Sequence, residues 1–114
     1  MHAENVYVSI TGLRLKGRRH LLRFWWHTLR SMVQARRAPG NLRTEMRMVG
    51  CVHHTLSVWT SEQAMRAFLV AGAHRDAMKV FRAIGNGRTL GFVTDRPPDW
   101  DDGLRRWHSE AKDV

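Results

Sequence analysis

Hydrophobic and polar residues alternate along four short segments of the chain. In the first of them, Val6, Val8 and Ile10 fall on one face of an extended backbone, and Tyr7 and Ser9 fall on the other. Alternation with a period of two is typical of β-strands that bury one face. The predicted strands are residues 5–15, 42–49, 52–59 and 88–94.

Between these strands, apolar residues recur at steps of three and four, which is typical of amphipathic helices. The predicted helices are residues 18–38, a segment that begins at Thr60 and stops before Gly72, and residues 73–84. In the first helix we expect the apolar stripe to face the core and the arginines to face water; the stripe is Leu22, Trp25 or Trp26, Leu29, Met32 and Val33. In the second, Thr60 and Gln63 have the spacing of a capping box.

The resulting order is β-α-β-β-α(α)-β, which predicts an α+β, ferredoxin-like fold: a four-stranded antiparallel sheet with its helices on one face. This domain is assigned to residues 1–96. Pro97 and Pro98 then interrupt the chain, and Asp99 can cap a short helix. Residues 97–114 are therefore predicted to be a helical tail, whose apolar residues pack on the domain or on a dimer partner.

Composition excludes several classes of protein. The 114 residues suit one small domain, and the lone Cys51 cannot form an internal disulfide or a multi-cysteine zinc site. No apolar stretch is long enough to span a membrane, and the N-terminal decapeptide does not resemble a signal peptide. We therefore expect a cytoplasmic protein with no membrane partner. A homodimer would enlarge the core that so short a chain can bury.

The net charge of +9 is concentrated in the first half of the chain. Residues 1–50 contain ten Arg or Lys and two Glu, so 10 − 2 = +8, whereas residues 51–114 contain nine and eight, so 9 − 8 = +1. Such asymmetry can mark a surface for nucleic acid. The aromatic and motif patterns that accompany nucleic-acid binding are missing, so we favour a solvated basic face.

Two histidines, His54 and His74, are candidates for chemistry. Because successive strand residues point to opposite faces, His54 is predicted to lie under the helices and His53 to lie on the outer or dimer-facing side. His74 lies on the apolar face of its own helix, so His54 and His74 are predicted to share one layer. They could be hydrogen-bonded core residues or could contact a ligand, and they are too few to predict a metal site.

The stretch HTLSVWTSEQAMRAFLVAGAHRDAMKVF, residues 54–81, resembles the central segment of the dimeric α/β-barrel superfamily, which includes the antibiotic biosynthesis monooxygenase-like proteins. LSVW closes a strand, and AHRDAM opens a helix. The similarity is greatest to the spheroidene monooxygenase-like proteins and to a related bacterial family of unknown function. The element order agrees over about residues 5–95.

The resemblance implies a homodimer in which two sheets pack face to face, with a pocket between each sheet and its helices. Cofactor-free oxygenation of aromatic compounds, haem binding and degradation, isomerisation and regulatory binding all occur in the superfamily. In its haem-degrading members, a histidine on the helix that corresponds to AHRDAM of this chain ligates the iron. His74 matches that histidine in type and placement. Haem is therefore a possible cofactor.

Three functions follow, in order of preference. The first is a monooxygenase-like enzyme that binds an apolar aromatic ligand or haem, with His74 and His54 as catalytic residues. The second is a non-enzymatic dimeric module that binds a small ligand or has a regulatory role, and the third is a basic nucleic-acid binder. The residues predicted to line the pocket are Trp25, Trp26, Trp59, Phe68 and Phe81.

Overall fold

A computed structural model describes residues 5–114 of the chain. Its five strands form one antiparallel sheet in the order β2-β3-β1-β4-β5. The strands are β1 (Val6–Leu15), β2 (Asn41–Val49), β3 (Val52–Trp59), β4 (Gly85–Thr94) and β5 (Lys112–Asp113). The helices are the 3-10 turn η1 (Arg18–His20), then α1 (Leu21–Arg37), α2 (Glu62–Leu69), α3 (Gly72–Ile84) and α4 (Trp100–Glu110).

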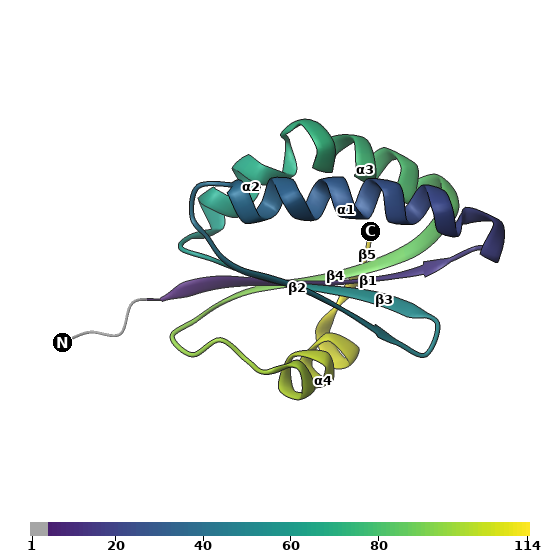
Figure 1. Cartoon of the computed structure of the whole chain (residues 1–114). Helices are drawn as coiled ribbons and strands as arrows, with labels where there is room; N and C mark the ends of the chain where they lie inside the picture. Colours follow the sequence, from purple (N-terminus) through teal and green to yellow (C-terminus); the bar gives the residue numbers. More distant parts are fainter. Residues whose placement is uncertain (1–4) are drawn as a thin grey trace.

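The predicted element order and the ferredoxin-like fold are confirmed. The predicted number of strands is wrong, because the two residues of β5 pair with Arg88 and Thr89 and add a fifth strand. Helices α1, α2 and α3 cover one face of the sheet, and α4 lies against the opposite face (Figure 1). Residues 1–4 lie outside the described residues. They belong to the stretch in which we expected no signal peptide and to the domain assigned to residues 1–96.

Two helix starts show how local chemistry sets the boundaries. Ser61, and not the predicted Thr60, caps α2, since its hydroxyl accepts a hydrogen bond from the Ala64 amide at 3.1 Å. Asp99 caps α4 as predicted, and its carboxylate accepts from the Asp102 amide at 2.8 Å. In both helices an acidic residue in the first turn adds a favourable interaction with the helix dipole.

The more apolar face of the sheet meets α4, not α1–α3. Val8, Ile10, Leu56 and Val58 form one buried cluster with Trp107 of α4. We predicted that this face would meet the other helices, and that prediction is wrong. The apolar face is buried, as expected, but α4 covers it in place of α1–α3. The two faces of the sheet are therefore exchanged relative to the prediction.

Trp107 is the centre of the contact between α4 and the sheet. A side chain at position 12 would collide with its indole ring, so the bare backbone of Gly12 makes the close approach possible. The Trp107 indole N–H donates to the Arg88 carbonyl at 3.2 Å, and the Arg88 guanidinium lies 5.2 Å from the ring centroid. At the other end of α4, the Trp100 indole N–H donates to Glu45 at 3.0 Å.

Helix α1 also faces the other way from the prediction. Its buried residues are Phe24, Thr28, Ser31 and Ala35. Most of the apolar stripe that we expected in the core is exposed; its exposed members are Leu22, Trp25, Trp26, Leu29 and Val33. Among the described residues, no helix is both long enough and apolar enough to cross a membrane.

Replacing Gly12 with alanine tests the contact between α4 and the sheet. The added methyl group meets the Trp107 ring and lies 3.0 Å from His54 Cε1, so we expect a loss of about 1–3 kcal/mol in the free energy of unfolding. Urea denaturation measures it. Gly72→Ala is the matched control, because nothing lies within 4 Å of the methyl group it adds. Equal stability of the two variants would show that α4 does not need the bare backbone.

Candidate functional site

A cavity of about 790 Å³ lies between the sheet and helices α1, α2 and α3. Its floor is the polar face of the sheet, and its roof is the inner faces of the three helices. The floor includes the hydroxyl-bearing residues Tyr7, Ser9, Thr11, Thr44, Thr55 and Ser57. The roof includes Phe24, Met32, Phe68, Met78 and Phe81.

Strand register explains the hydroxyl groups on the floor. Ser9 of β1 pairs with Ser57 of β3, and Thr11 pairs with Thr55, so the four side chains lie side by side on one face. Since the opposite face is taken up by α4, these small polar residues are left to face the cavity. They leave room above the sheet that larger apolar side chains would have filled.

Aromatic rings close the cavity from the helix side. The Phe24 ring centroid lies 5.3 Å from that of Phe81 and 4.4 Å from the His53 imidazole. On α2, Phe68 lies 4.4 Å from the His74 ring. A ligand between floor and roof would therefore contact oxygen atoms on one side and aromatic carbon on the other, which suits a flat molecule with polar substituents.

His53 and His74 both line this cavity. Burial lowers the pKa of each imidazole below its ordinary value, so both are neutral at pH 7. His74 Nδ1 lies 3.4 Å from the Leu69 carbonyl oxygen, an arrangement that places the ring proton on Nδ1. Its Nε2 is then the basic nitrogen, available to accept a proton or to bind a metal.

His54 does not share a layer with His74, so that prediction is wrong. His54 is only 1% exposed, and its ring lies 4.6 Å from the Trp107 ring on the α4 side of the sheet. Its Nδ1 is 3.2 Å from the Thr11 carbonyl oxygen. The residue that takes its expected place is the adjacent His53, because the inversion of the sheet exchanges the two.

Two hydroxyl groups stand out among the polar residues around the cavity. Burial, followed by the nearby Glu62 carboxylate, raises the pKa of Tyr7, so this phenol keeps its proton and can donate a hydrogen bond. The hydroxyl of Thr28 on α1 is buried and has no hydrogen-bond partner within residues 5–114. A buried hydroxyl without a partner is costly, and a polar atom of a ligand would satisfy it.

The predicted pocket aromatics fall into three groups. Phe68 and Phe81 line the cavity. Trp59 is fully buried behind Phe68, with the two rings stacked 5.2 Å apart, and Trp25 lies at the edge with its ring 5.9 Å from that of His53. Trp26 is on the outside of α1. Whether any of them binds a ligand stays a prediction.

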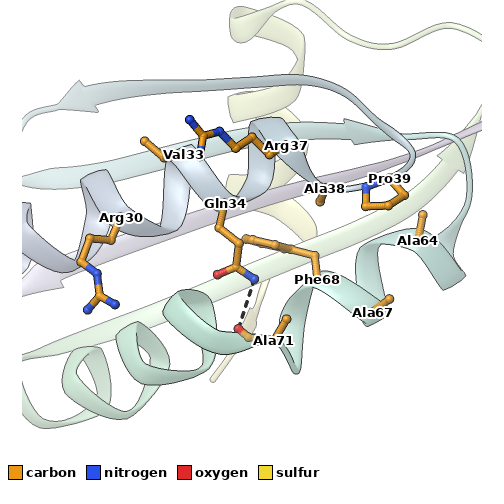
Figure 2. Close-up of a pocket in the computed structure, with 10 residues that line it drawn as sticks. All are labelled: Arg30, Val33, Gln34, Arg37, Ala38, Pro39, Ala64, Ala67, Phe68 and Ala71. Carbon is orange, nitrogen blue, oxygen red and sulfur yellow. Dashed lines mark hydrogen bonds between the residues drawn. The ribbon is translucent and has the colours of Figure 1, made fainter.

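A second hollow, a surface groove, lies between α1 and α2 (Figure 2). Arg30, Val33 and Arg37 line it from α1, and Ala64, Ala67 and Phe68 line it from α2. The Gln34 side-chain amide donates to the Ala71 carbonyl at 3.2 Å and ties the two sides together. Phe68 also lines the cavity between the sheet and the helices, so this residue borders both hollows.

Within the described part of the chain, no three His, Cys, Asp or Glu side chains are grouped so that they could hold a metal ion. The site therefore depends on two neutral histidines, a row of hydroxyls and an aromatic roof. Sequence reasoning missed His53, Phe24 and the hydroxyl floor. The matched small polar residues of β1 and β3 were the pattern that could have identified the floor.

The architecture is that of the antibiotic biosynthesis monooxygenase-like proteins, so the resemblance drawn from residues 54–81 is confirmed for the fold. SnoaB, a cofactor-independent oxygenase from Streptomyces nogalater, superposes with a TM-score of 0.69 at 18% identity, over 82% of this chain and 96% of SnoaB. A putative antibiotic biosynthesis monooxygenase from Nitrosomonas europaea gives 0.69 at 14%, over 82% and 91%. One from Caulobacter crescentus gives 0.67 at 13%, over 83% and 92%.

At these identities the likeness shows the fold alone. No protein-family model matches the sequence, and no curated protein sequence matches it either.

The neutral histidines predict a dependence of stability on pH. The unfolded chain binds protons at these histidines below about pH 6.5, whereas the folded protein resists protonation because the pKa values of His53, His54 and His74 are lowered. Full stability is thus expected above about pH 6.5, with a loss of up to about 1.4 kcal/mol per pH unit for each histidine as the pH falls below that value.

Urea denaturation of the wild type and of His53→Gln/His74→Gln between about pH 8 and pH 5 measures this dependence. We expect the double variant to have a shallower slope, since only His54 remains of the three. Gly72→Ala, which removes no titratable group and adds a methyl group with nothing within 4 Å, is the control and should keep the wild-type slope. Parallel slopes for the wild type and the double variant would contradict the assignment.

Proposed function

We propose that this protein is a monooxygenase-like enzyme whose ligand is a flat, oxygen-bearing aromatic molecule held in the cavity between the sheet and α1–α3. The observation that carries the proposal is the pairing of a hydroxyl floor, headed by Ser9 and Ser57, with an aromatic roof. The floor can hydrogen-bond ring oxygens, while Phe24 and Phe81 can pack on the ring face.

His74 is the residue best suited to act as a general base. Its Nδ1 faces the Leu69 carbonyl, and its Nε2 is unprotonated at neutral pH because burial lowers the pKa of the ring. His53, on the floor beside Phe24, is placed to orient the ligand. His54 has no part in this proposal, since it lies on the α4 side of the sheet.

Oxygenation of a phenol can proceed with dioxygen as the only co-reactant. The base takes the phenol proton and leaves an electron-rich phenolate, which is the form that transfers electrons to O₂. One oxygen atom of O₂ becomes the second carbonyl of a quinone. The other leaves as water with the phenol proton and the hydrogen from the attacked ring carbon, so atoms and electrons balance. SnoaB, with the same fold, is described as cofactor-independent.

Filling the cavity tests the proposal directly. Ser57→Phe places a ring on the floor, so we expect it to weaken binding of a dihydroxyanthraquinone probe by about tenfold or more. Absorbance titration measures the affinity. Cys51→Phe, which adds the same ring at the exposed turn between β2 and β3, should bind as the wild type does.

A dihydroxyanthrone, the reduced and electron-rich form of this probe, separates binding from chemistry. If the protein is an enzyme, the wild type consumes O₂ in its presence, and His74→Gln lowers the rate with little change in affinity. Binding without O₂ uptake would favour the non-enzymatic, ligand-binding alternative. Equal binding by Ser57→Phe and the wild type would rule out this cavity as the site.

Haem is a second candidate ligand, favoured by the environment of His74. Ligating histidines commonly donate their other ring N–H to a carbonyl, as Nδ1 can to Leu69 here, and this leaves Nε2 for iron. The donor therefore fits, and Arg82, which also lines the cavity, could pair with a propionate. Bound haem would supply redox chemistry at its iron.

Titration with haem tests this second candidate. We expect a shifted Soret band on binding to the wild type and loss of that shift in His74→Ala, because the only imidazole proposed as ligand is removed. His20→Ala is the control and should keep the shift. A spectrum that is the same for wild type and His74→Ala would exclude ligation by His74, without bearing on the aromatic ligand.

A further inference from the structure

The outer face of α1 is apolar along its whole length. Leu22, Trp26, Leu29 and Val33 follow at steps of four, three and four residues, so they form one stripe on the helix. They are 88%, 63%, 57% and 50% exposed, respectively. The stripe lies opposite the face that carries the buried Phe24 and Thr28, and with 17 residues α1 is roughly 25 Å long.

A row of arginines runs beside this stripe. Arg23, Arg30 and Arg37 are seven residues apart and are all exposed, so they share one side of the helix. The Arg30 guanidinium lies 5.8 Å from the Trp26 ring centroid. From residue 12 to residue 44 the chain has nine Arg or Lys and no Asp or Glu. The surface around the stripe is therefore strongly basic.

From these observations we propose that the outer face of α1 docks on the surface of an anionic phospholipid membrane. Tryptophan and leucine on one face, with arginines along its edge, are the pattern of helices that lie in the membrane interface. The stripe enters the boundary of the acyl chains, and the arginines pair with headgroup phosphates. This binding is peripheral, so it replaces the expectation of no membrane partner, which rested on the lack of a spanning segment, and it is independent of the function proposed for the cavity.

The groove between α1 and α2 continues this face. Three residues of α1 that line the groove also lie on this face, and Figure 2 shows them along α1. Val33 is part of the stripe, and Arg30 and Arg37 flank it. The two arginines thus stand between the stripe and the groove, at the level where phosphates of a docked bilayer lie. On its inner side α1 lines the cavity through Phe24 and Thr28, so a single helix connects membrane surface and cavity.

Charge also argues against a second copy of the chain as the occupant. In a two-fold dimer through α1, the same patch of each subunit meets its counterpart. Arg23, Arg30 and Arg37 of the two copies would then approach one another, and residues 12–44 offer no carboxylate to offset them. An anionic lipid surface provides the opposite charge and accepts a convex apolar helix without a matching groove.

Sedimentation of the full chain with lipid vesicles tests the proposal. We expect binding to vesicles of phosphatidylcholine mixed with phosphatidylglycerol, weaker binding to phosphatidylcholine alone, and a decrease with added salt. Tryptophan fluorescence should shift to the blue on binding, as Trp26 leaves water.

Two pairs of substitutions assign the binding to α1. Leu22→Ser/Trp26→Ser and Arg23→Glu/Arg30→Glu should each weaken binding about tenfold or more. The controls are Met48→Ser, which is 63% exposed at the end of β2, and Arg105→Glu, on α4 at the opposite face of the sheet. Both controls should bind as the wild type does, and equal thermal unfolding midpoints would show that all four variants are folded.

Absence of binding to the anionic vesicles would overturn the proposal, as would equal losses in the α1 variants and their controls. A dimer in solution that Leu22→Ser/Trp26→Ser dissociates, without vesicle binding, would assign the stripe to a second copy instead. Binding to duplex DNA that is lost in Arg23→Glu/Arg30→Glu but kept in Leu22→Ser/Trp26→Ser, again without vesicle binding, would assign the arginines to nucleic acid.

Discussion

The packing of Trp107 over Gly12 determines which face of the sheet α4 covers and which face lines the cavity. An indole can approach β1 this closely only where the backbone carries no side chain, and there it covers Ile10 and Leu56 with its neighbours on α4. Burial of a residue of this size contributes about 1.5–3 kcal/mol, and the cation and hydrogen-bond contacts with Arg88 fix its position. Once α4 has taken the apolar face, the polar face is all that is left for α1–α3.

The consequence is a core that is divided in two. On the α4 side, side chains fill the space, as the fully buried Val8 and Ile10 show. On the other side, small hydroxyls face phenylalanines across a cavity of about 790 Å³. Keeping such space open gives up packing energy that larger side chains would supply. The neutral state of His53 and His74 and the partnerless hydroxyl of Thr28 belong to this looser half, which is where a ligand can be accommodated.

Much of the fold could be read from the sequence, because the period of each segment is a local property. The residues of β1 and β3 were predicted almost to the residue, and Asp99 as a helix cap followed from its position before an apolar spacing. The orientation of the sheet could not be read in this way, because period two identifies two faces but does not say which element covers each. Because we assigned the apolar face of the sheet to α1–α3 and not to the tail, His54 was placed in the wrong layer and His53 was left out of the site.

The orientation of α1 was also predicted wrongly, because the residues expected in the core lie on its outer face. A stripe of leucine, tryptophan and valine is normally the buried face of a helix, but the face of the sheet beneath α1 is polar and set back by the cavity. The helix meets it with Phe24, Thr28, Ser31 and Ala35, a narrow and mostly small set, and its larger apolar residues remain outside. The two faces of α1 therefore differ in kind: the inner face lines the cavity with Phe24 and small side chains, and the outer face carries the larger apolar residues.

Helix α4 also constrains how two copies of the chain could associate. The family resemblance implies a dimer in which two sheets meet face to face, and that stays a prediction for this chain. Val8, Ile10 and Leu56 are already fully buried by α4 within one chain, so a partner sheet would gain no apolar burial from them. Any dimer that packs on this face of the sheet must therefore either contact the outer surface of α4 or displace Trp107, which would expose the apolar face that Gly12 allows it to cover. Trp107 thus determines both which face of the sheet is covered by α4 and how two sheets could pack in a dimer.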